Sequence, residues 1–260
     1  MLEPRRVAAR SVASFMASQL GEPVGQTVGY RTRTDTRISA GTRLEVVTEG
    51  VLTRMALSDP ELRGIALVIF DEFHERSLNA DLGLALVREI REAFRPDLGL
   101  LVMSATLDPE PLAEWLGGCR VLHAEGRPHP VELRYVLRPE DRPLGQRMAR
   151  AVRELADQMA DDQAPEGDIL AFLPGVREIE DTCGALRPWS GREGWDVLPL
   201  HGRLEGEAQD LALRRGRRRR VVVSTNIAET SVTVDGVSGV IDSGQVRINR
   251  LDPGSGLNRL

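Results

Sequence analysis

Short apolar runs rich in β-branched residues alternate with longer helical patterns along this chain of 260 residues. This alternation constrains the fold strongly, because a helix between two strands returns the chain to the same end of the sheet and makes the strands parallel. The predicted strands are residues 44–47, 65–70, 100–103, 169–173, 197–200, 221–224 and 240–242. The sequence therefore predicts an α/β fold built on parallel sheets.

Helical patterns occupy much of the remaining chain. Residues 7–20 form one such pattern, which Gly21 ends, and residues 80–94 form another, which stops before Pro96 after a basic last turn. Apolar residues recur every three or four positions from Leu144 to Met159, which predicts a helix with one buried stripe.

A proline-rich stretch divides the chain into two parts. Residues 126–143 read GRPHPVELRYVLRPEDRP, with one short strand-like run, and this composition is typical of a connector. We therefore predict a first domain at 1–126, a linker at 127–143 and a second domain at 144–260.

The composition excludes several classes of protein. No run approaches the roughly 18 apolar residues of a membrane span, and the first 30 residues lack the pattern of a secretory signal. These features predict a cytoplasmic protein with no membrane association. Cys119 and Cys183 lack CxxC spacing, so they indicate neither a zinc site nor a disulfide framework, and we expect both to fill small gaps in the core.

The charge is informative in two ways. A formal net charge of −5 argues against indiscriminate coating of nucleic acid, so any site for a polyanion must be local. All 34 basic residues are arginine. A phosphate loop of the form G-x-x-x-x-G-K-[ST] requires lysine, so these 260 residues contain none.

The strand at 65–70 ends in an unusual group of polar residues, Asp71, Glu72 and His74. In open α/β sheets ligands bind beside the carboxyl ends of the strands. Mg²⁺ takes one or two carboxylates together with phosphate oxygens and water, so Asp71 is a candidate ligand for Mg²⁺. Glu72 would then lie close enough to the metal to contact it and to orient or deprotonate an attacking water.

This stretch has two other interpretations. A zinc-protease helix of the form HExxH would need histidine at position 78, which is Leu78, so that interpretation fails. An acidic cluster that stabilises the start of a helix remains plausible from these residues alone, because carboxylates favour the positive end of the helix dipole.

Motifs elsewhere in the chain favour the first interpretation. The stretch DEFHERS at 71–77 resembles motif II of the DExH/DEAH helicases, and SAT at 104–106 resembles motif III. EPRRVAAR at 3–10 resembles motif Ia, and VTEG at 47–50 resembles the next nucleic-acid motif. AFLPG at 171–175, LHG at 200–202 and STNIAETSVTVDGVSGVIDSG at 224–244 resemble motif IV, the turn that follows it, and motif V.

The resemblance covers nearly the whole chain, with the motifs in the family's order and spacing. Phe73 departs from the alanine that is usual in DEAH proteins. Together with EPRR and the continuation SLNADLGLAL, it narrows the resemblance to one bacterial group of ATP-dependent RNA helicases.

The resemblance implies two RecA-like domains that use ATP, or another nucleoside triphosphate, with Mg²⁺ and act on single-stranded RNA, with DNA not excluded. It implies that Ser104 and Thr106 link the state of the nucleotide to strand separation, with His74 on the motif II side of that contact. It implies that Thr233, Asp235 and Asp242 contact the nucleotide. It implies that the nucleic acid is contacted by Arg5, Arg6, Thr48, Thr225 and Asn226.

Each of these residues also has a simpler structural interpretation. The arginine pair 5–6 either grips backbone phosphates or is solvated, although cations oppose the dipole at a helix start. Thr48 is a candidate cap for a helix that starts at Glu49. Ser104 and Thr106 could merely satisfy a turn before a helix that starts at Asp108 and Pro109.

Two further stretches are ambiguous. The polar loop 225–231 is longer than a simple strand-to-helix turn requires, which favours a functional role. The run RRGRRRR at 214–220 follows a helical pattern at 204–213, where positive charge complements the carboxyl end of the helix dipole. We therefore predict that this run is a solvated turn and not a specific contact.

In the family, a phosphate-loop strand precedes motif Ia and a Q-x-x-G-R-x-G-R motif follows motif V. Neither is present in these 260 residues. The resemblance therefore implies an interior part of a longer enzyme, with both domains truncated, marginal stability and negligible ATPase activity in isolation. The alternatives are a non-catalytic nucleic-acid-binding module and another nucleoside triphosphatase, although the latter does not explain the loop 225–231.

Overall fold

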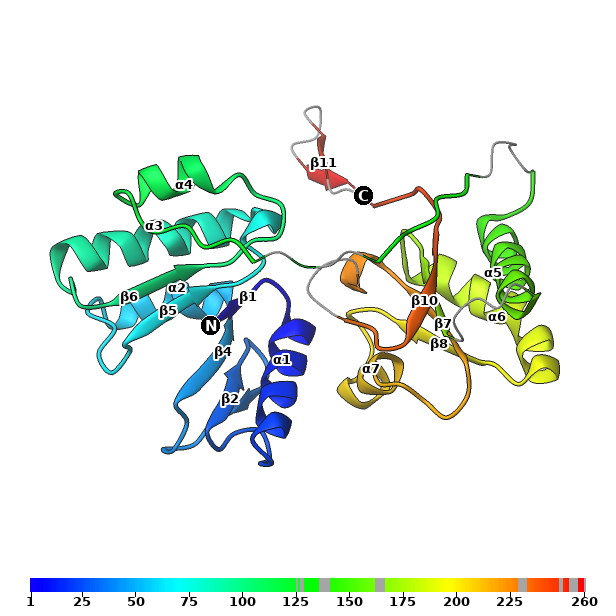
Figure 1. Cartoon of the computed structure of the whole chain (residues 1–260), viewed down its shortest axis with the longest axis horizontal. Coiled ribbons are helices and arrows are strands. Elements are labelled where there is room, and N and C mark those ends of the chain that lie inside the picture. The colour runs from blue at the N-terminus through cyan, green and yellow to red at the C-terminus, as the bar shows by residue number, and fades with distance from the viewer. Residues whose placement is uncertain are drawn as a thin grey trace. The chain divides into compact units, whose positions relative to one another are not determined.

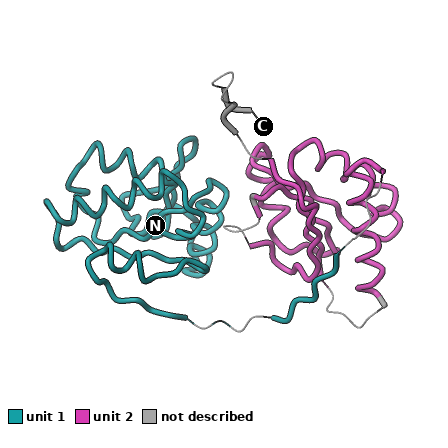
Figure 2. The backbone as a smooth tube through the Cα atoms, turned by 90° about the horizontal axis from the view of Figure 1, so that it is seen from above, with its two compact units in different colours: residues 1–138 teal, residues 139–260 magenta. Residues whose placement is uncertain are grey.

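The computed structural model describes residues 1–124, 126, 129–135, 141–161, 167–228, 233–247, 250–252 and 257–259. The chain forms two compact units, residues 1–138 and 139–260, which are coloured teal and magenta in Figure 2. The division falls inside the proline-rich stretch predicted as a linker.

Unit 1 is built on a six-stranded sheet with the strand order β3-β2-β4-β1-β5-β6. Strand β3 is antiparallel to β2, and the other neighbours are parallel. The strands predicted at 44–47, 65–70 and 100–103 are confirmed with small shifts of their ends. The strands of this sheet are β1 (Leu2–Glu3), β2 (Val28–Arg31), β3 (Thr36–Arg37), β4 (Leu44–Thr48), β5 (Leu67–Phe70) and β6 (Gly99–Val102).

Helices cover both faces of this sheet (Figure 1). Helix α1 (Arg6–Gln19) presents Ala9, Ala13 and Ala17 to one face, where they pack with Val46 of β4. The next residue of β4, Val47, belongs to the core on the other face, because successive side chains of a strand point to opposite sides. That second core includes side chains of α2 (Glu49–Ser58), α3 (Leu78–Ala93) and α4 (Pro109–Trp115).

Unit 2 contains a four-stranded parallel sheet with the order β10-β7-β9-β8. The predicted strands 169–173, 197–200, 221–224 and 240–242 are confirmed. The sheet is made of β7 (Asp168–Phe172), β8 (Asp196–Leu200), β9 (Arg220–Ser224) and β10 (Val237–Asp242). The helices are α5 (Leu144–Asp161), α6 (Val176–Glu193) and α7 (Gly206–Leu213), and a separate antiparallel pair is formed by β11 (Arg250–Asp252) and β12 (Leu257–Arg259).

The core of unit 2 confirms the apolar stripe predicted on α5. Met148, Val152 and Met159 are buried in it, with Leu144 and Leu155 at its edge. These side chains pack with residues of α6 and of the sheet. The methionine spacing therefore marks a packed helix face.

The prediction of a solvated turn at 214–220 is wrong for two of its arginines. Arg220 is fully buried, and its Nη2 lies 2.6 Å from Oδ2 of Asp168. Arg219 stacks on Trp195 with its Cζ 4.1 Å from the ring centroid, and its Nε donates to the carbonyl of Gly167. A buried, hydrogen-bonded ion pair of this kind fixes the start of β9, because breaking it leaves a charge without a partner.

The cysteine prediction is wrong in one part. Cys183 is half-buried at the edge of the unit 2 core, whereas Cys119 is exposed and fills no core gap. None of the described helices combines the length and apolarity that a membrane crossing requires.

Candidate nucleotide and nucleic-acid site

The loop after β5 carries the carboxylates predicted from sequence. Asp71 follows the strand directly; its N–H donates to the carbonyl of Leu2 at 3.1 Å, and its Oδ1 accepts from the N–H of Glu72 at 2.8 Å. Glu72 has φ 50° and ψ 35°, a left-handed conformation. Such a conformation costs a non-glycine residue about 1 to 2 kcal/mol, so the surrounding structure must hold it.

Phe73 stabilises this turn by packing into the core and by a backbone hydrogen bond. Its side chain is buried and meets the ring of Phe70 edge to face, with 6.1 Å between centroids. Its N–H donates to the carbonyl of Met103, the residue after β6. The phenylalanine that replaces the usual alanine is therefore a packing residue beneath the loop, and it ties the loop to the neighbouring strand.

His74 connects motif II to motif III. Its Nδ1 accepts from the backbone N–H of Ala105 at 3.3 Å, and its Nε2 lies 3.3 Å from Oε2 of Glu72. A neutral imidazole that accepts at Nδ1 carries its proton on Nε2, so that proton faces the Glu72 carboxylate. The contact expected between the two motifs is therefore made, on the motif III side, by a backbone amide.

Burial raises the pKa of Glu72, and the charges of Asp71 and Glu75 raise it further, while His74 acts in the opposite direction. A general base is more effective when its pKa lies closer to the working pH. The raised pKa of Glu72 is thus a shift in the direction that suits a general base.

Glu3 is a third carboxylate at this place, and the sequence analysis missed it. It ends β1, the strand between β4 and β5, and it is almost completely buried. Burial is the main cause that raises its pKa to about 8, and Asp71 and Glu72 add to the effect. Its Oε1 has no hydrogen-bond partner among the described residues. Position 3 stands next to the arginines of motif Ia, but a strand of two residues gives little sequence signal.

These side chains fit the ligand preference of Mg²⁺. The ion takes one or two carboxylates and completes its shell with phosphate oxygens and water, and it relieves repulsion between neighbouring carboxylates. Within the described ranges, no group of three or more His, Cys, Asp or Glu side chains is arranged to hold a metal by itself. The protein would therefore supply only part of the shell, from Asp71 and Glu72.

Ser104 and Thr106 are both exposed beside this loop. Oγ of Ser104 accepts from the N–H of Leu107 at 3.1 Å, so the hydroxyl satisfies the turn before α4. Asp108 caps α4 by accepting from the N–H of Glu110, which agrees with the structural interpretation of a turn before a helix at Asp108. The local role of Ser104 does not exclude a second contact, because a hydroxyl has further hydrogen-bonding capacity.

The predicted nucleic-acid residues of unit 1 lie beside the same loop. Arg5 donates from Nη2 to Oε2 of Glu75 at 3.4 Å, and Arg6 donates from Nη1 to Oγ1 of Thr34 at 3.4 Å. Thr48 stands at the start of α2, but its side chain makes no capping hydrogen bond, so the predicted side-chain cap is wrong.

Glu49 and Ser77 tie α2 to α3. Oγ of Ser77 donates to Oε2 of Glu49 at 2.7 Å and accepts from the N–H of Ala80, which caps α3. The residues after Thr48 are thereby joined to the end of motif II.

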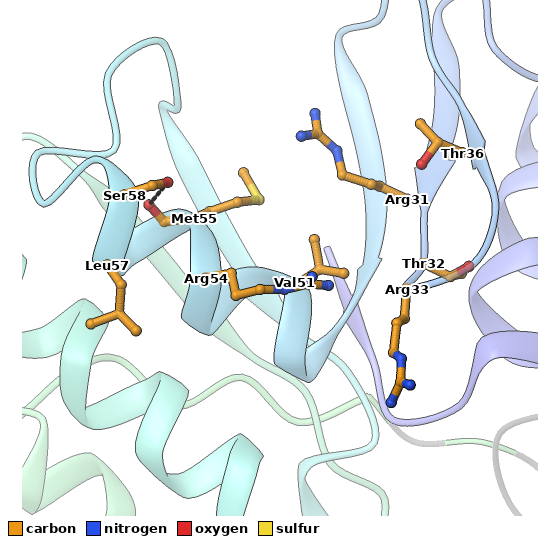
Figure 3. A pocket seen from close by; sticks show the side chains of 9 residues that line it. All are labelled: Arg31, Thr32, Arg33, Thr36, Val51, Arg54, Met55, Leu57 and Ser58. Atoms are coloured by element: carbon orange, nitrogen blue, oxygen red, sulfur yellow. Dashed lines mark hydrogen bonds between the residues drawn. The ribbon is translucent and has the colours of Figure 1, made fainter.

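An open pocket of about 640 Å³ lies between α2 and the β2–β3 hairpin of unit 1. Figure 3 shows Arg31 pointing from the hairpin toward the helix and Arg54 pointing from the helix toward the hairpin, and Arg33 lines the pocket at the hairpin. Arg31 also pairs with Glu45 at 3.0 Å. The other lining residues are Thr32, Thr36, Val51, Met55, Leu57 and Ser58. The pocket thus combines guanidinium groups, hydroxyls and a short apolar wall.

In unit 2 the structure separates some of the predicted site residues. Thr225 follows the carboxyl end of β9, and exposed Asn226 begins the short turn Asn226–Ala228. Asp242 ends β10 at the same edge, and its Oδ1 accepts from the N–H of Gly244. Residues 229–232, in the middle of the predicted loop, lie outside the described part of the chain.

Thr233 and Asp235 precede β10 and therefore lie toward the amino ends of the strands. The carbonyl of Asp235 accepts from Nη2 of Arg220, at the start of β9. The exposed side chains of Thr233 and Asp235 are thus not brought to the edge that holds Asp242. The two ends of a strand lie at opposite edges of the sheet, and no sequence pattern indicates at which edge the residues before β10 lie.

Known proteins share these features. Residues 146–247 match the family model of the helicase conserved C-terminal domain. The chain is 48% identical over 264 aligned residues to the ATP-dependent RNA helicase HrpB of Escherichia coli strain K12, covering 100% of this chain and 32% of that protein. The chain is therefore similar over its whole length to an ATP-dependent RNA helicase.

A second relative and a solved structure are also similar to this chain. The ATP-dependent RNA helicase HrpA of the same strain is 37% identical over 99% of this chain and 20% of its own length. A crystal structure of the E. coli DEAH/RHA helicase HrpB matches with a TM-score of 0.89 and 47% identity, over 99% of this chain and 32% of that one. The predicted class of two RecA-like α/β units is confirmed by this match. The chain spans about a third of the length of its HrpB relative.

Proposed function

We propose that this chain belongs to an ATP-dependent RNA helicase of the DEAH type, in which nucleoside triphosphate hydrolysis drives movement on single-stranded nucleic acid. The similarity to HrpB and HrpA along the whole chain supports the class. The arrangement of carboxylates after β5 supports the chemistry.

The observation that carries the proposal is the chain of contacts from Glu72 through His74 to Ala105. It connects a carboxylate suited to water activation with the loop of motif III. A change at the nucleotide can therefore reach that loop through one imidazole, because both of its nitrogens are engaged.

In the proposed mechanism, Asp71 would hold Mg²⁺, with Glu72 beside it, and a bound ion would supply positive charge for the phosphates. Glu72 orients the attacking water and accepts its proton. His74, whose Nε2 lies 3.3 Å from Oε2 of Glu72, keeps that carboxylate in place. Ser104 and Thr106 lie on the side to which this signal passes. Asp242, at the carboxyl end of β10, contributes on the nucleotide side of unit 2.

The proposed nucleic-acid contacts lie around motif Ia and α2. Arg5, Arg6 and Thr48 supply guanidinium and hydroxyl groups for backbone phosphates, which such groups bind without reading sequence. Arg6 donates to Thr34, which follows Arg33 of the arginine-lined pocket in the chain, so that pocket lies near Arg6. Thr225 and Asn226 are the corresponding contacts of unit 2. Single-stranded RNA is the proposed substrate, with DNA as the alternative.

The proposal also covers the domain boundaries of the chain and the cellular compartment in which the protein acts. The first domain comprises residues 1–126, the linker 127–143 and the second domain 144–260, and the protein acts in the cytoplasm. Because the 260 residues contain no lysine, a phosphate-binding lysine must come from a segment outside them. The 260 residues alone are therefore expected to hydrolyse ATP negligibly.

The test is ATP hydrolysis by the longest natural polypeptide that carries these residues, with and without single-stranded RNA or DNA. Glu72→Gln should lower the RNA-stimulated rate by at least about 100-fold, because it removes the base that general acid–base catalysis requires. Glu92→Gln is the control, because Glu92 is exposed on α3 and pairs only with Arg88 among the residues described.

Two results would contradict the proposal. Hydrolysis that survives Glu72→Gln at the control rate would remove Glu72 from the chemistry. Binding of RNA with no hydrolysis under any condition would favour the alternative, a non-catalytic nucleic-acid-binding module.

A further inference from the structure

A strongly basic loop joins α7 to β9 in unit 2. This basic loop comprises residues 214–219, which read RRGRRR. Four of its arginines, Arg214, Arg215, Arg217 and Arg218, are exposed. Within the described residues, the side chains of these four arginines form no hydrogen bond or ion pair with any carboxylate.

Buried contacts fix the carboxyl end of the basic loop. Arg220, the next residue, donates from its backbone N–H and from Nε to the two oxygens of Asp168 at 2.8 and 2.7 Å. Its Nη1 donates back to the carbonyls of Ala212 and Arg214. Arg219 is stacked on Trp195. The loop therefore closes around a buried guanidinium.

The amino end and the middle of the loop are fixed as well. The N–H of Arg214 donates to the carbonyl of Asp210 in α7 at 3.0 Å. A Cβ built on Gly216 would lie 3.5 Å from Cδ of Arg220, so the middle of the loop rests on that side chain. The backbone under the four exposed arginines is thus ordered before any ligand arrives, which lowers the entropy cost of binding.

A solvated turn does not account well for this arrangement. The dipole of α7 favours positive charge at its carboxyl end, but the effect fades within the last turn and reaches only the first arginine or two. Beyond that point, neighbouring like charges repel one another and oppose the compact state. Two other exposed arginines of unit 2, Arg150 and Arg247, pair with Glu154 and Glu178. Single exposed arginines without a carboxylate partner among the described residues also occur, for example Arg187 and Arg192, but only the basic loop gathers four of them within five positions of the described part of unit 2.

The basic loop lies at the end of the sheet opposite to the candidate site. It precedes β9, whereas Thr225 and Asn226 follow it. The five residues of β9 span about 16 Å at about 3.3 Å per residue. The loop is therefore a surface separate from those residues.

We propose that the basic loop binds the phosphodiester backbone of single-stranded nucleic acid and gives unit 2 a second, sequence-independent contact. Guanidinium groups match phosphate oxygens with two parallel hydrogen bonds, and four of them on a fixed backbone suit a chain of regularly spaced phosphates. The partner rests on the proposed function, whereas the surface itself follows from the four uncompensated arginines.

The test compares two double variants of the 260-residue chain. Arg217→Gln with Arg218→Gln removes two charges from the basic loop but leaves its anchors, Arg219 and Arg220. Arg187→Gln with Arg192→Gln removes the same charge from two exposed positions of α6. Fluorescence anisotropy with dye-labelled single-stranded RNA, and with DNA of the same sequence, gives the binding constant from about 50 to about 200 mM salt.

The basic-loop variant should bind about 5- to 20-fold more weakly at the lowest salt, and the slope of log K against log salt should fall by about 1.4, because each phosphate contact on a single strand contributes about 0.7. The α6 variant should keep the parent slope. The RNA and DNA arms show which nucleic acid is preferred.

Equal slopes for the parent chain and the basic-loop variant would overturn this inference and leave the proposed function standing. If the basic-loop variant keeps the parent slope for nucleic acid but no longer binds polyglutamate, the loop binds an acidic protein partner. That result would also overturn this inference. A parent chain that binds neither RNA nor DNA would contradict both this inference and the nucleic-acid part of the proposed function.

Discussion

At the scale of single residues, the site depends on carboxylates that the fold forces together. Glu3, Asp71 and Glu72 come from the ends of β1 and β5, which are neighbours in the sheet. Their burial, and then their mutual repulsion, raise the pKa of Glu3 and Glu72. Such repulsion between neighbouring carboxylates is typical of sites where a protein binds a cation or transfers a proton.

Glu3 gives a prediction about stability and pH. In the folded chain its pKa is about 8, compared with 4.5 for an unperturbed glutamate, so between these values the folded state holds a proton that the unfolded state has lost. The free energy of unfolding therefore falls as the pH rises from 4.5 toward 8. Between pH 6 and pH 8 the free energy of unfolding of the parent chain should fall by about 1 to 2 kcal/mol because of Glu3, and Glu3→Gln should remove this fall.

Urea unfolding of both proteins at the two pH values measures this difference. Glu45→Gln is a suitable control, since Glu45 lies on neighbouring β4 but is only half-buried and pairs with Arg31. A Glu3→Gln variant with the same pH dependence as the parent would show that Glu3 is ionised in the folded chain.

At the scale of elements, the sequence predicted the strands that consist of continuous apolar runs. Residues 221–224, all buried, are an example, because a parallel strand covered on both faces has a simple signature. It missed β2 and β3. Their side chains include arginine and threonine, and β3 has only two residues. The pairing of these two strands depends on the turn between them, which no local pattern revealed.

The candidate site shows the same difference between residues that a local pattern predicts and residues that depend on the fold. Asp71, Glu72 and His74 were found because a strand and its sequel carry a recognisable motif. Glu3 and the arginine pocket were missed because they depend on which strands become neighbours in space. The buried position of Arg220 was missed for a similar reason, since its partner Asp168 is 52 residues away along the chain.

The β2–β3 hairpin gives a prediction at this scale. A Cβ on Gly29 of β2 would lie 2.3 Å from the carbonyl oxygen of Arg37, which forces the two strands apart. Gly29→Ala should destabilise unit 1 by about 1 to 3 kcal/mol, as overpacking does, and should disturb the pocket between the hairpin and α2.

The matched control is Gly50→Ala in α2, where the added methyl group meets no atom within 4 Å. That change should be neutral or stabilise the chain by up to about 1 kcal/mol, because alanine favours the helix. Thermal unfolding followed by circular dichroism measures both variants. A Gly29→Ala protein as stable as the Gly50→Ala protein would show that the hairpin relaxes without cost.

At the scale of the whole molecule, the chain has separate cores in its two units. The large core of unit 1 includes Leu84 of α3, and the core of unit 2 includes Leu186 of α6. Both side chains are nearly or completely buried, at 2% and 0% exposure. Because no described core cluster contains side chains of both units, we expect each unit to unfold as its own cooperative step.

Leu84→Ala and Leu186→Ala test this expectation as a matched pair. Each should lower the stability of its own unit by about 2 to 5 kcal/mol and leave the other transition in place. Tryptophan emission reports mainly on unit 2, which holds Trp189 and Trp195, while circular dichroism reports on both units. If either variant shifts both transitions equally, the two units unfold as one.

The stacking of Arg219 on Trp195 has an optical consequence. An indole ring in contact with a guanidinium group senses small changes in the field around it, and here that group belongs to the basic loop. The loop is therefore attached to a built-in chromophore. The chain reports occupancy of this surface by its own emission, so that a titration with unlabelled nucleic acid needs no dye and no engineered probe.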